Sequence, residues 1–141
     1  MNNKKTRSRL HAVKMMYQWE ITKDKPEEIT VRYWESTDET NSSVIKGANE
    51  LFSKSLEKVS WTDDLLVKML KKGWTFERMG EIEKSVLRVA IYDILNNKVP
   101  SFAANNDYAT ITSQYVDQKT ASFVHGILQS VENEFIQETE R

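Results

Sequence analysis

The sequence predicts an all-α fold, with about seven helices in two small bundles that share a core. Apolar residues recur at helical spacing along most of the chain, whereas the alternating pattern of strands is scarce. Only two prolines and four glycines occur among the 141 residues, so few positions force a helix to end. Residues 81–96 carry apolar side chains around most of a helical circumference, which indicates a central helix packed on several sides.

The predicted central helix also contains an arginine among its apolar residues. Its two apolar stripes are Ile82, Val86, Val89 and Ile94, and Leu87, Ile91 and Leu95. Arg88 lies between Leu87 and Val89 in the sequence. A buried charge without a partner is too costly to keep, so we expect Arg88 to reach the rim of the core or to pair with a carboxylate.

Further helices are predicted before and after this one. Thr6 or Ser8 is a candidate cap for the first helix, and the segment 60–63 resembles a capping box. Thr75 and Ser101 are candidate caps for a short turn and for the helix after the central one. The predicted helices cover residues 6–22, 26–36, 44–59, 60–73, 81–96, 102–115 and a last segment after 120, with a polar loop at 37–43 and a turn at 116–120.

The composition is that of an ordinary globular domain and excludes several kinds of function. We expect a single domain over residues 1–141, with an N-terminal subdomain over 1–73 and a C-terminal subdomain over 74–141. The chain has no cysteine, which excludes disulfides, cysteine-ligated metals and thiol nucleophiles. It has no Gly-rich phosphate loop, nucleophile elbow or metal-ligand spacing, so we expect no enzyme and no cofactor. Because no apolar run reaches the length of a membrane span and the basic start lacks the apolar core of a signal peptide, we expect a cytoplasmic protein without a membrane partner.

The formal net charge of −1 hides a basic beginning. Residues 1–19 contain no acidic residue and carry the cations Lys4, Lys5, Arg7, Arg9 and Lys14. Cations at the start of a helix oppose its dipole, so their position is locally unfavourable and hints at function. A basic end on a nearly neutral protein can bind a polyanion. The alternative is a solvated leader whose charges only aid solubility.

Several short motifs follow one another along nearly the whole chain. They are Arg7-x-Arg9, Ala12-Val13 and Met16-Tyr17-Gln18-Trp19 in the first helix, the block from Gly80 to Tyr92, Val99-Pro100, Asn106-Asp107-Tyr108-Ala109, and Phe123-Val124-His125-Gly126-Ile127-Leu128. In these motifs, their order and their spacing, the chain resembles the NusB family of bacterial transcription antitermination factors. Each motif alone is weak, but together they are specific.

The resemblance implies a fold, a partner and a nucleic-acid ligand. It implies two helical subdomains and a complex with the small-subunit ribosomal protein that acts as NusE, within the RNA polymerase antitermination complex. The pair would bind boxA-type single-stranded RNA in ribosomal RNA leaders. The positions that the resemblance links to RNA are Lys4, Lys5, Arg7, Arg9, Lys119 and Phe123. The positions that it links to the protein partner or the adjoining core are Tyr17, Glu83 and Arg88. Phe123 can stack on an exposed base, and the alternative for Phe123 and Tyr17 is a purely structural role in the core.

The chain departs from the family pattern near its last helix. His125 replaces the usual asparagine, Ser122 replaces a frequent basic residue, Lys119 stands at an acidic position, and Val116 replaces a glycine. These departures keep open an alternative, a NusB-like protein–protein adaptor with weak or no specific RNA binding. A NusB-like domain of the kind fused to ribosomal RNA cytosine methyltransferases is disfavoured, because it predicts a catalytic cysteine.

Overall fold

The computed structural model describes residues 3–70, 75–97 and 102–136, and within these ranges every regular element is helical. The predicted all-α fold is therefore confirmed. The elements are α1 (Lys4–Thr22), α2 (Pro26–Glu35), α3 (Ser42–Glu57), α4 (Val59–Met69), the 3₁₀ turn η1 (Phe76–Arg78), α5 (Glu81–Asn97), α6 (Phe102–Tyr115), α7 (Gln118–Val131) and the π-helical turn η2 (Glu132–Ile136).

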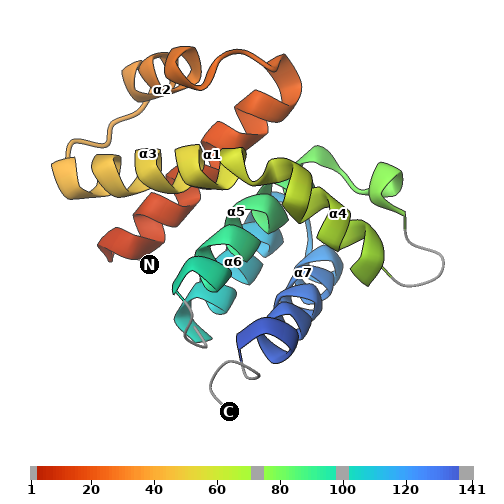
Figure 1. Cartoon of the computed structure of the whole chain (residues 1–141). Helices are drawn as coiled ribbons and strands as arrows, with labels where there is room; N and C mark the ends of the chain where they lie inside the picture. The colour runs from red at the N-terminus through yellow and green to blue at the C-terminus, as the bar shows by residue number, and fades with distance from the viewer. Residues whose placement is uncertain (1–2, 71–74, 98–101, 137–141) are drawn as a thin grey trace.

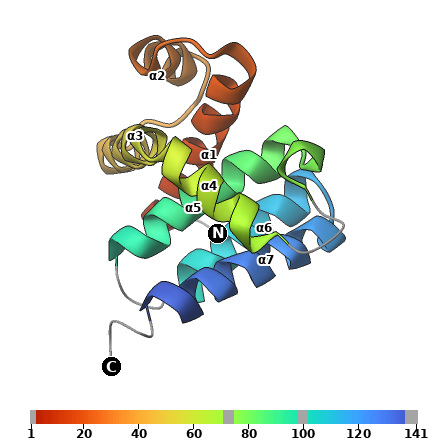
Figure 2. The same ribbon diagram turned by 45° about the vertical axis from the view of Figure 1, so that its right-hand side comes forward.

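Helix α5 lies at the centre of the molecule. It packs against α1, α3, α4, α6 and α7, while α2 packs on α1 away from this centre (Figure 1). Helices α6 and α7 run side by side beneath α5, as the rotated view in Figure 2 also shows. Every residue from Ser85 to Ile91 is buried, as the apolar stripes predict. One core cluster joins residues from the first and second halves of the chain, and the predicted subdomain boundary at 73/74 lies outside the described residues.

Asparagine and aspartate side chains cap three of the described helices. Asn3 accepts a hydrogen bond from the N–H of Thr6 at 2.8 Å, so α1 begins at Lys4. Asn41 caps α3 in the same way. Asp117 caps α7, so the last part of the turn predicted at 116–120 is already helical. Each cap supplies an acceptor to backbone N–H groups that have no partner within the helix.

The caps predicted at serine and threonine residues differ from those observed. The Thr6 and Ser8 hydroxyls bond to α6 and α3 instead of capping α1. Ser60 lies inside the first turn of α4, which begins at Val59 without a side-chain cap, so the predicted capping box is wrong. Thr75 precedes η1 but makes no capping bond with its side chain. Two predicted helix ends, Gly73 and Ser101, lie outside the described residues.

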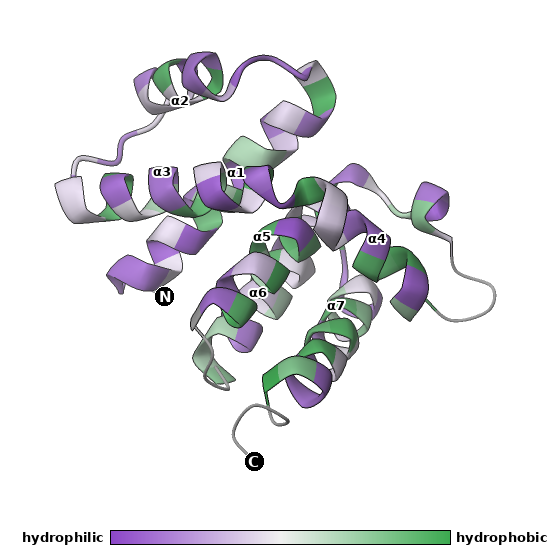
Figure 3. Cartoon of the chain, viewed as in Figure 1, coloured by the Kyte–Doolittle hydropathy of each residue, from purple (hydrophilic) through white to green (hydrophobic). Residues whose placement is uncertain are grey.

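The residues at the beginning of α1 are hydrophilic, as the hydropathy colours in Figure 3 show. Along α3, hydrophilic and hydrophobic residues alternate. Among the described residues, no helix combines the length and the apolar character that a membrane span needs. The same residues contain no group of His, Asp and Glu side chains that could hold a metal ion.

Candidate nucleic-acid interface

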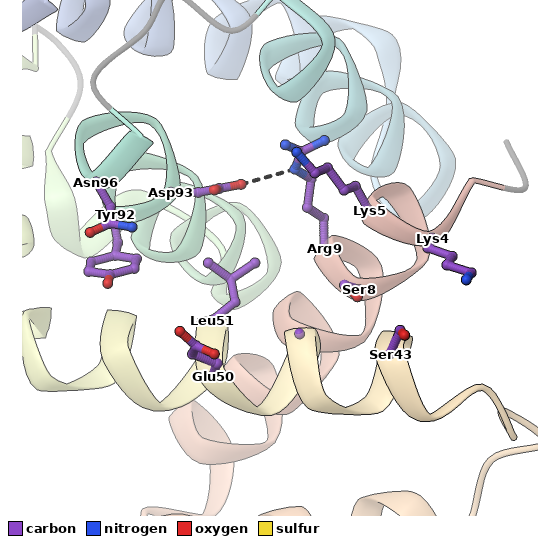
Figure 4. Close-up of a pocket in the computed structure, with 11 residues that line it drawn as sticks. Lys4, Lys5, Ser8, Arg9, Ser43, Glu50, Leu51, Tyr92, Asp93 and Asn96 are labelled. Atoms are coloured by element: carbon purple, nitrogen blue, oxygen red, sulfur yellow. Dashed lines mark hydrogen bonds and ion pairs between the residues drawn. The ribbon is translucent and has the colours of Figure 1, made fainter.

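Two exposed lysines stand at one end of a groove between α1, α3 and α5. Lys4 and Lys5 form no salt bridge with any described residue, and both line this groove, whose volume is about 470 Å³ (Figure 4). Tyr92 and Asn96 of α5 lie at the opposite end of the view from Lys4. The other lining residues are Ser8, Arg9, Ser43, Gly47, Glu50, Leu51 and Asp93.

A close approach of α1 to α3 fixes the position of these lysines. A Cβ atom on Gly47 would lie 2.9 Å from Ser8 Oγ, so any larger residue would force the two helices apart or displace Ser8. Ser8 Oγ also donates a hydrogen bond to the Val44 carbonyl at 2.9 Å. The beginning of α1 is therefore held against α3, with Lys4 and Lys5 at the edge of the groove.

Arg9 points into the protein and joins three helices. The residue is only 8% exposed. Its guanidinium donates hydrogen bonds to Asp93 of α5 at 3.0 Å and to Asp107 of α6 at 2.9 Å. Tyr108 donates to the same Asp93 oxygen at 2.7 Å, and Thr6 donates to Asp107 at 2.9 Å. Burial disfavours the charged guanidinium, but the two carboxylates outweigh burial, so the pKa of Arg9 is raised. The charge of Arg9 is matched inside the fold.

Arg7 is held by a glutamate from the loop between α2 and α3. Its Nε and one terminal nitrogen donate to the two Glu39 carboxylate oxygens at 3.1 Å each. His11 Nε2 lies 3.2 Å from the same carboxylate, and His11 Nδ1 lies 2.6 Å from the Tyr33 hydroxyl. The hydrogen bond from Arg7 is the main reason that the pKa of Glu39 falls to about 2. Burial lowers the pKa of His11, so this histidine is neutral near pH 7.

The predicted RNA-binding residues of the last helix lie near its beginning. Lys119 is exposed, and Phe123 is half-buried and packs against the core. A second groove, of about 260 Å³, lies between α6 and α7. It is lined by Asn106, Ala109, Thr110, Ser113, Gln118, Ala121, Ser122 and His125, which include two of the departures from the family pattern.

Tyr17 lies in a mainly apolar hollow on another part of α1. The hollow has a volume of about 380 Å³ and is lined by Leu10, Val13, Lys14, Tyr17, Gln18, Tyr33, Ile82, Ile111 and Tyr115. Tyr17 and Tyr115 are both exposed, and Lys14 Nζ lies 5.6 Å from the centre of the Tyr115 ring. Exposed tyrosines beside an apolar hollow are typical of a protein-binding surface. Glu83 lies near this region at the start of α5, where its carboxylate folds over Gly80.

Arg88 is buried and pairs with carboxylates, which is one of the two outcomes expected from the sequence. The residue is 4% exposed, and two of its guanidinium nitrogens donate to Asp63 of α4 at 2.8 and 2.9 Å. A third nitrogen donates to Glu20 of α1 at 3.2 Å. The guanidinium also lies near the rings of Trp19 and Phe76. Although burial works against the charged form, Asp63 and Glu20 outweigh it and raise the pKa of Arg88, so Arg88 is charged at neutral pH.

The structure thus separates the cations that the sequence groups together. Lys4 and Lys5 lie on the surface, Arg7 is partly buried in its pair with Glu39, and Arg9 is buried. The sequence analysis missed Glu39, Asp93 and Tyr92, which either match the charge of the arginines or line the groove. Tyr92 and Asp107 lie within motifs of the family resemblance, but those motifs do not indicate that Tyr92 lines a groove or that Asp107 pairs with Arg9.

Comparison with known proteins identifies the family. The sequence profile of the NusB family matches residues 6–133. The transcription antitermination protein NusB of Anaeromyxobacter sp. (strain Fw109-5) is 28% identical over 131 residues, which cover 93% of this chain and 91% of that protein. T. maritima NusB has a similar structure, with a TM-score of 0.82 and 27% identity over 96% of this chain and 95% of that one. A chain in the crystal structure of antitermination factors NusB and NusE in complex with dsRNA shares the fold, with a TM-score of 0.85 and 21% identity over 94% and 98% of the two chains. The chain therefore belongs to the NusB family, a family of transcription antitermination proteins and not of enzymes.

Proposed function

We propose that this protein is a cytoplasmic antitermination factor that binds boxA-type single-stranded RNA in ribosomal RNA leaders. It does so together with the small-subunit ribosomal protein that acts as NusE, within the RNA polymerase antitermination complex. The observation that carries the proposal is the pair of exposed, unpaired lysines at the mouth of a groove in a chain of the NusB family. The ammonium groups of these lysines can neutralise RNA phosphates, because no carboxylate of the protein competes with the phosphates for them.

The remaining predicted site residues either contact the RNA or the partner protein, or hold the contacting residues in place. Arg7 is on the surface side of its pair with Glu39, so its guanidinium can bridge this carboxylate and a phosphate. Lys119 and Phe123 add a cation and an aromatic ring from α7. The hollow around Tyr17 supports a protein contact, since it combines apolar area with exposed tyrosines. Arg88 holds α5 against α1 and α4 through Glu20 and Asp63, and Glu83 lies at the beginning of α5 as a further candidate for the partner contact.

Binding to three RNA probes tests the proposal. The probes are a boxA-like single strand, a scrambled strand of equal composition, and the boxA strand annealed to its complement. Each is measured with and without the partner protein, beside a buffer blank. We expect the single boxA strand to bind most tightly, and the partner to increase that affinity. Binding that is indifferent to sequence and to partner would contradict the proposal. Capture of the partner without any RNA binding would support the adaptor alternative, which is favoured by the pairing of Arg7 and Arg9 with carboxylates.

The salt dependence of RNA binding measures the role of the two lysines. Each phosphate contact on a single strand contributes about −0.7 to the slope of log affinity against log salt. Replacing both Lys4 and Lys5 by alanine should therefore flatten that slope by about 1.4 without changing the melting temperature. The matched control replaces Lys25 and Lys68, which are exposed and line none of the grooves described above. An unchanged slope for the Lys4/Lys5 variant would remove these lysines from the interface.

Phe123→Ala should weaken binding through a different mechanism. If the ring stacks on a base, its loss costs about 1–3 kcal/mol of binding free energy and leaves the salt slope unchanged. Because Phe123 also packs against the core, the affinity must be corrected for the folded fraction, which a thermal melt supplies. A lower melting temperature with unaltered affinity of the folded protein would show that Phe123 has only a structural role.

A further inference from the structure

A second hollow continues the groove that begins at Lys4 and Lys5. Its volume is about 370 Å³, and it lies between the beginning of α4 and the C-terminal half of α5. Tyr92 and Asn96 line both hollows, since they stand four residues apart on one face of α5. In Figure 4 both side chains lie at the far end of the first groove from Lys4, with Tyr92 directed towards α3. The two hollows therefore form one track across the surface.

The second hollow presents two aromatic rings. Trp61 is 49% exposed, although tryptophan is usually among the more buried residues. The Phe135 ring, 6.2 Å away in an edge-to-face arrangement, orients the indole. Tyr92 supplies a second, half-buried ring from the facing helix. Flat aromatic surfaces on both sides of a hollow suit a planar ligand such as a nucleobase.

The hollow is also bordered by polar groups, one buried and one exposed. Thr62 is only 1% exposed, it lines the hollow, and its Oγ1 has no hydrogen-bond partner among the described residues. A buried polar group without a partner is costly, so such groups are rare in folded proteins. Asn96 adds an exposed amide, which can both donate to and accept from the edge of a base. The hollow thus offers hydrogen bonds as well as stacking surfaces.

The charges along the track favour a polyanion over an acidic or apolar peptide. Lys58, which is exposed, lines the second hollow and forms no salt bridge with a described residue. With Lys4 and Lys5 it gives three cations that form no salt bridge among the described residues, whereas Glu50 is the one lining carboxylate without such a bridge there. Arg9 shares its single positive charge between Asp93 and Asp107, so one net negative charge remains in that cluster and the cations of the track still outnumber the acids. Cations at both ends and rings between them match the alternation of phosphates and bases in a single strand.

We propose that single-stranded RNA held at Lys4 and Lys5 continues along this track and places a base in the pocket formed by Trp61 and Tyr92. Lys58 contacts a phosphate beside that base, and the Asn96 amide bonds its edge. The pocket lengthens the RNA footprint beyond the basic start and the α7 residues. This inference rests on the function proposed above, because it needs a strand that is already bound at the basic start.

Affinities for a short and a long strand test the pocket. The short probe is the boxA core, and the long probes add about six nucleotides at its 5′ or 3′ end, all measured with the partner protein present. Wild-type protein should bind one of the long probes more tightly than the core. The Trp61→Ala variant should bind that long probe at least about five-fold more weakly than the wild type does. Its affinity for the short boxA probe should equal that of the wild type. Trp61→Phe should retain most of the gain, because it keeps a stacking ring.

Two controls distinguish the pocket from other causes. Val67→Ala lies on the same helix, is as exposed as Trp61 and does not line the hollow, so it should change neither affinity. Thermal melts should show that Trp61→Ala is folded at the temperature of the assay. Equal affinity of wild type and Trp61→Ala for every long probe would overturn the pocket, while binding of the core would still support the proposed function. Failure of the wild type to bind any probe would overturn both.

Discussion

Replacing Val89 by aspartate will abolish the cooperative unfolding transition of this protein. Val89 is completely buried in the middle of α5, the helix that packs against most of the others. An aspartate there must either stay charged without a partner or take up a proton, and both outcomes are costly in an apolar core. The expected loss exceeds about 4 kcal/mol, which is comparable to the whole stability of a typical domain. Thermal and chemical denaturation, followed by circular dichroism, measure it.

The same substitution at an exposed valine is the control. Val31 is 63% exposed on α2, so Val31→Asp should leave the melt close to that of the wild type. Val89→Ala should give an intermediate result, with a cooperative transition at lower temperature, because it leaves a small cavity and no charge. A near-wild-type melt for Val89→Asp would show that α5 is not the centre of the fold.

The parts of the fold that the sequence predicts well are those set by apolar spacing. The bounds predicted for α6, residues 102–115, are those observed, and the burial of α5 follows from stripes that cover most of its circumference. The pairing of Arg88 with a carboxylate follows from the cost of burying an unpaired charge. These predictions succeed because each depends on residues that are close together in the sequence.

The helix ends were less predictable, for a local reason. Serine, threonine, asparagine and aspartate can all cap a helix, and several of them stand side by side at each boundary. The choice among them depends on which side chain is needed elsewhere. Thr6 is not available as a cap because its hydroxyl bonds Asp107, and Asn3 takes that role instead. Such competition is settled by tertiary contacts that no short window of sequence contains.

The pairing of charges at the candidate site could not be predicted either, because the paired residues are far apart in the sequence. The sequence identifies the cations at the beginning of the chain, but their partners lie far along it. Glu39 is 32 residues from Arg7, whereas Asp93 and Asp107 are 84 and 98 residues from Arg9. Only the packing of α1 against α5 and α6 brings these charges together. The sequence therefore predicts a basic start of four residues, and the structure divides it into exposed and paired cations.

Arg9→Ala will destabilise the protein by about 3 kcal/mol or more, because it leaves the buried Asp93 and the partly buried Asp107 without their cation. Lys4→Ala and Lys5→Ala remove the same charge from the surface and should leave the melting temperature unchanged. Adding Asp93→Asn and Asp107→Asn to Arg9→Ala should restore part of the lost stability, since the uncompensated charges are then gone. This pattern would identify Arg9 as the residue that holds the beginning of α1 against α5 and α6.

The RNA-binding role that the family resemblance assigns to Arg9 can be separated from this structural one. The salt slope of RNA binding is measured for Arg9→Ala at a temperature where the variant is fully folded. If Arg9 acts by positioning α1, the affinity falls while the slope stays that of the wild type, because no phosphate contact has been removed. A slope flattened by about 0.7, with a melting temperature close to that of the wild type, would instead place Arg9 on a phosphate. We expect the first result, because both carboxylates already bind the guanidinium and RNA would have to displace them from a buried site.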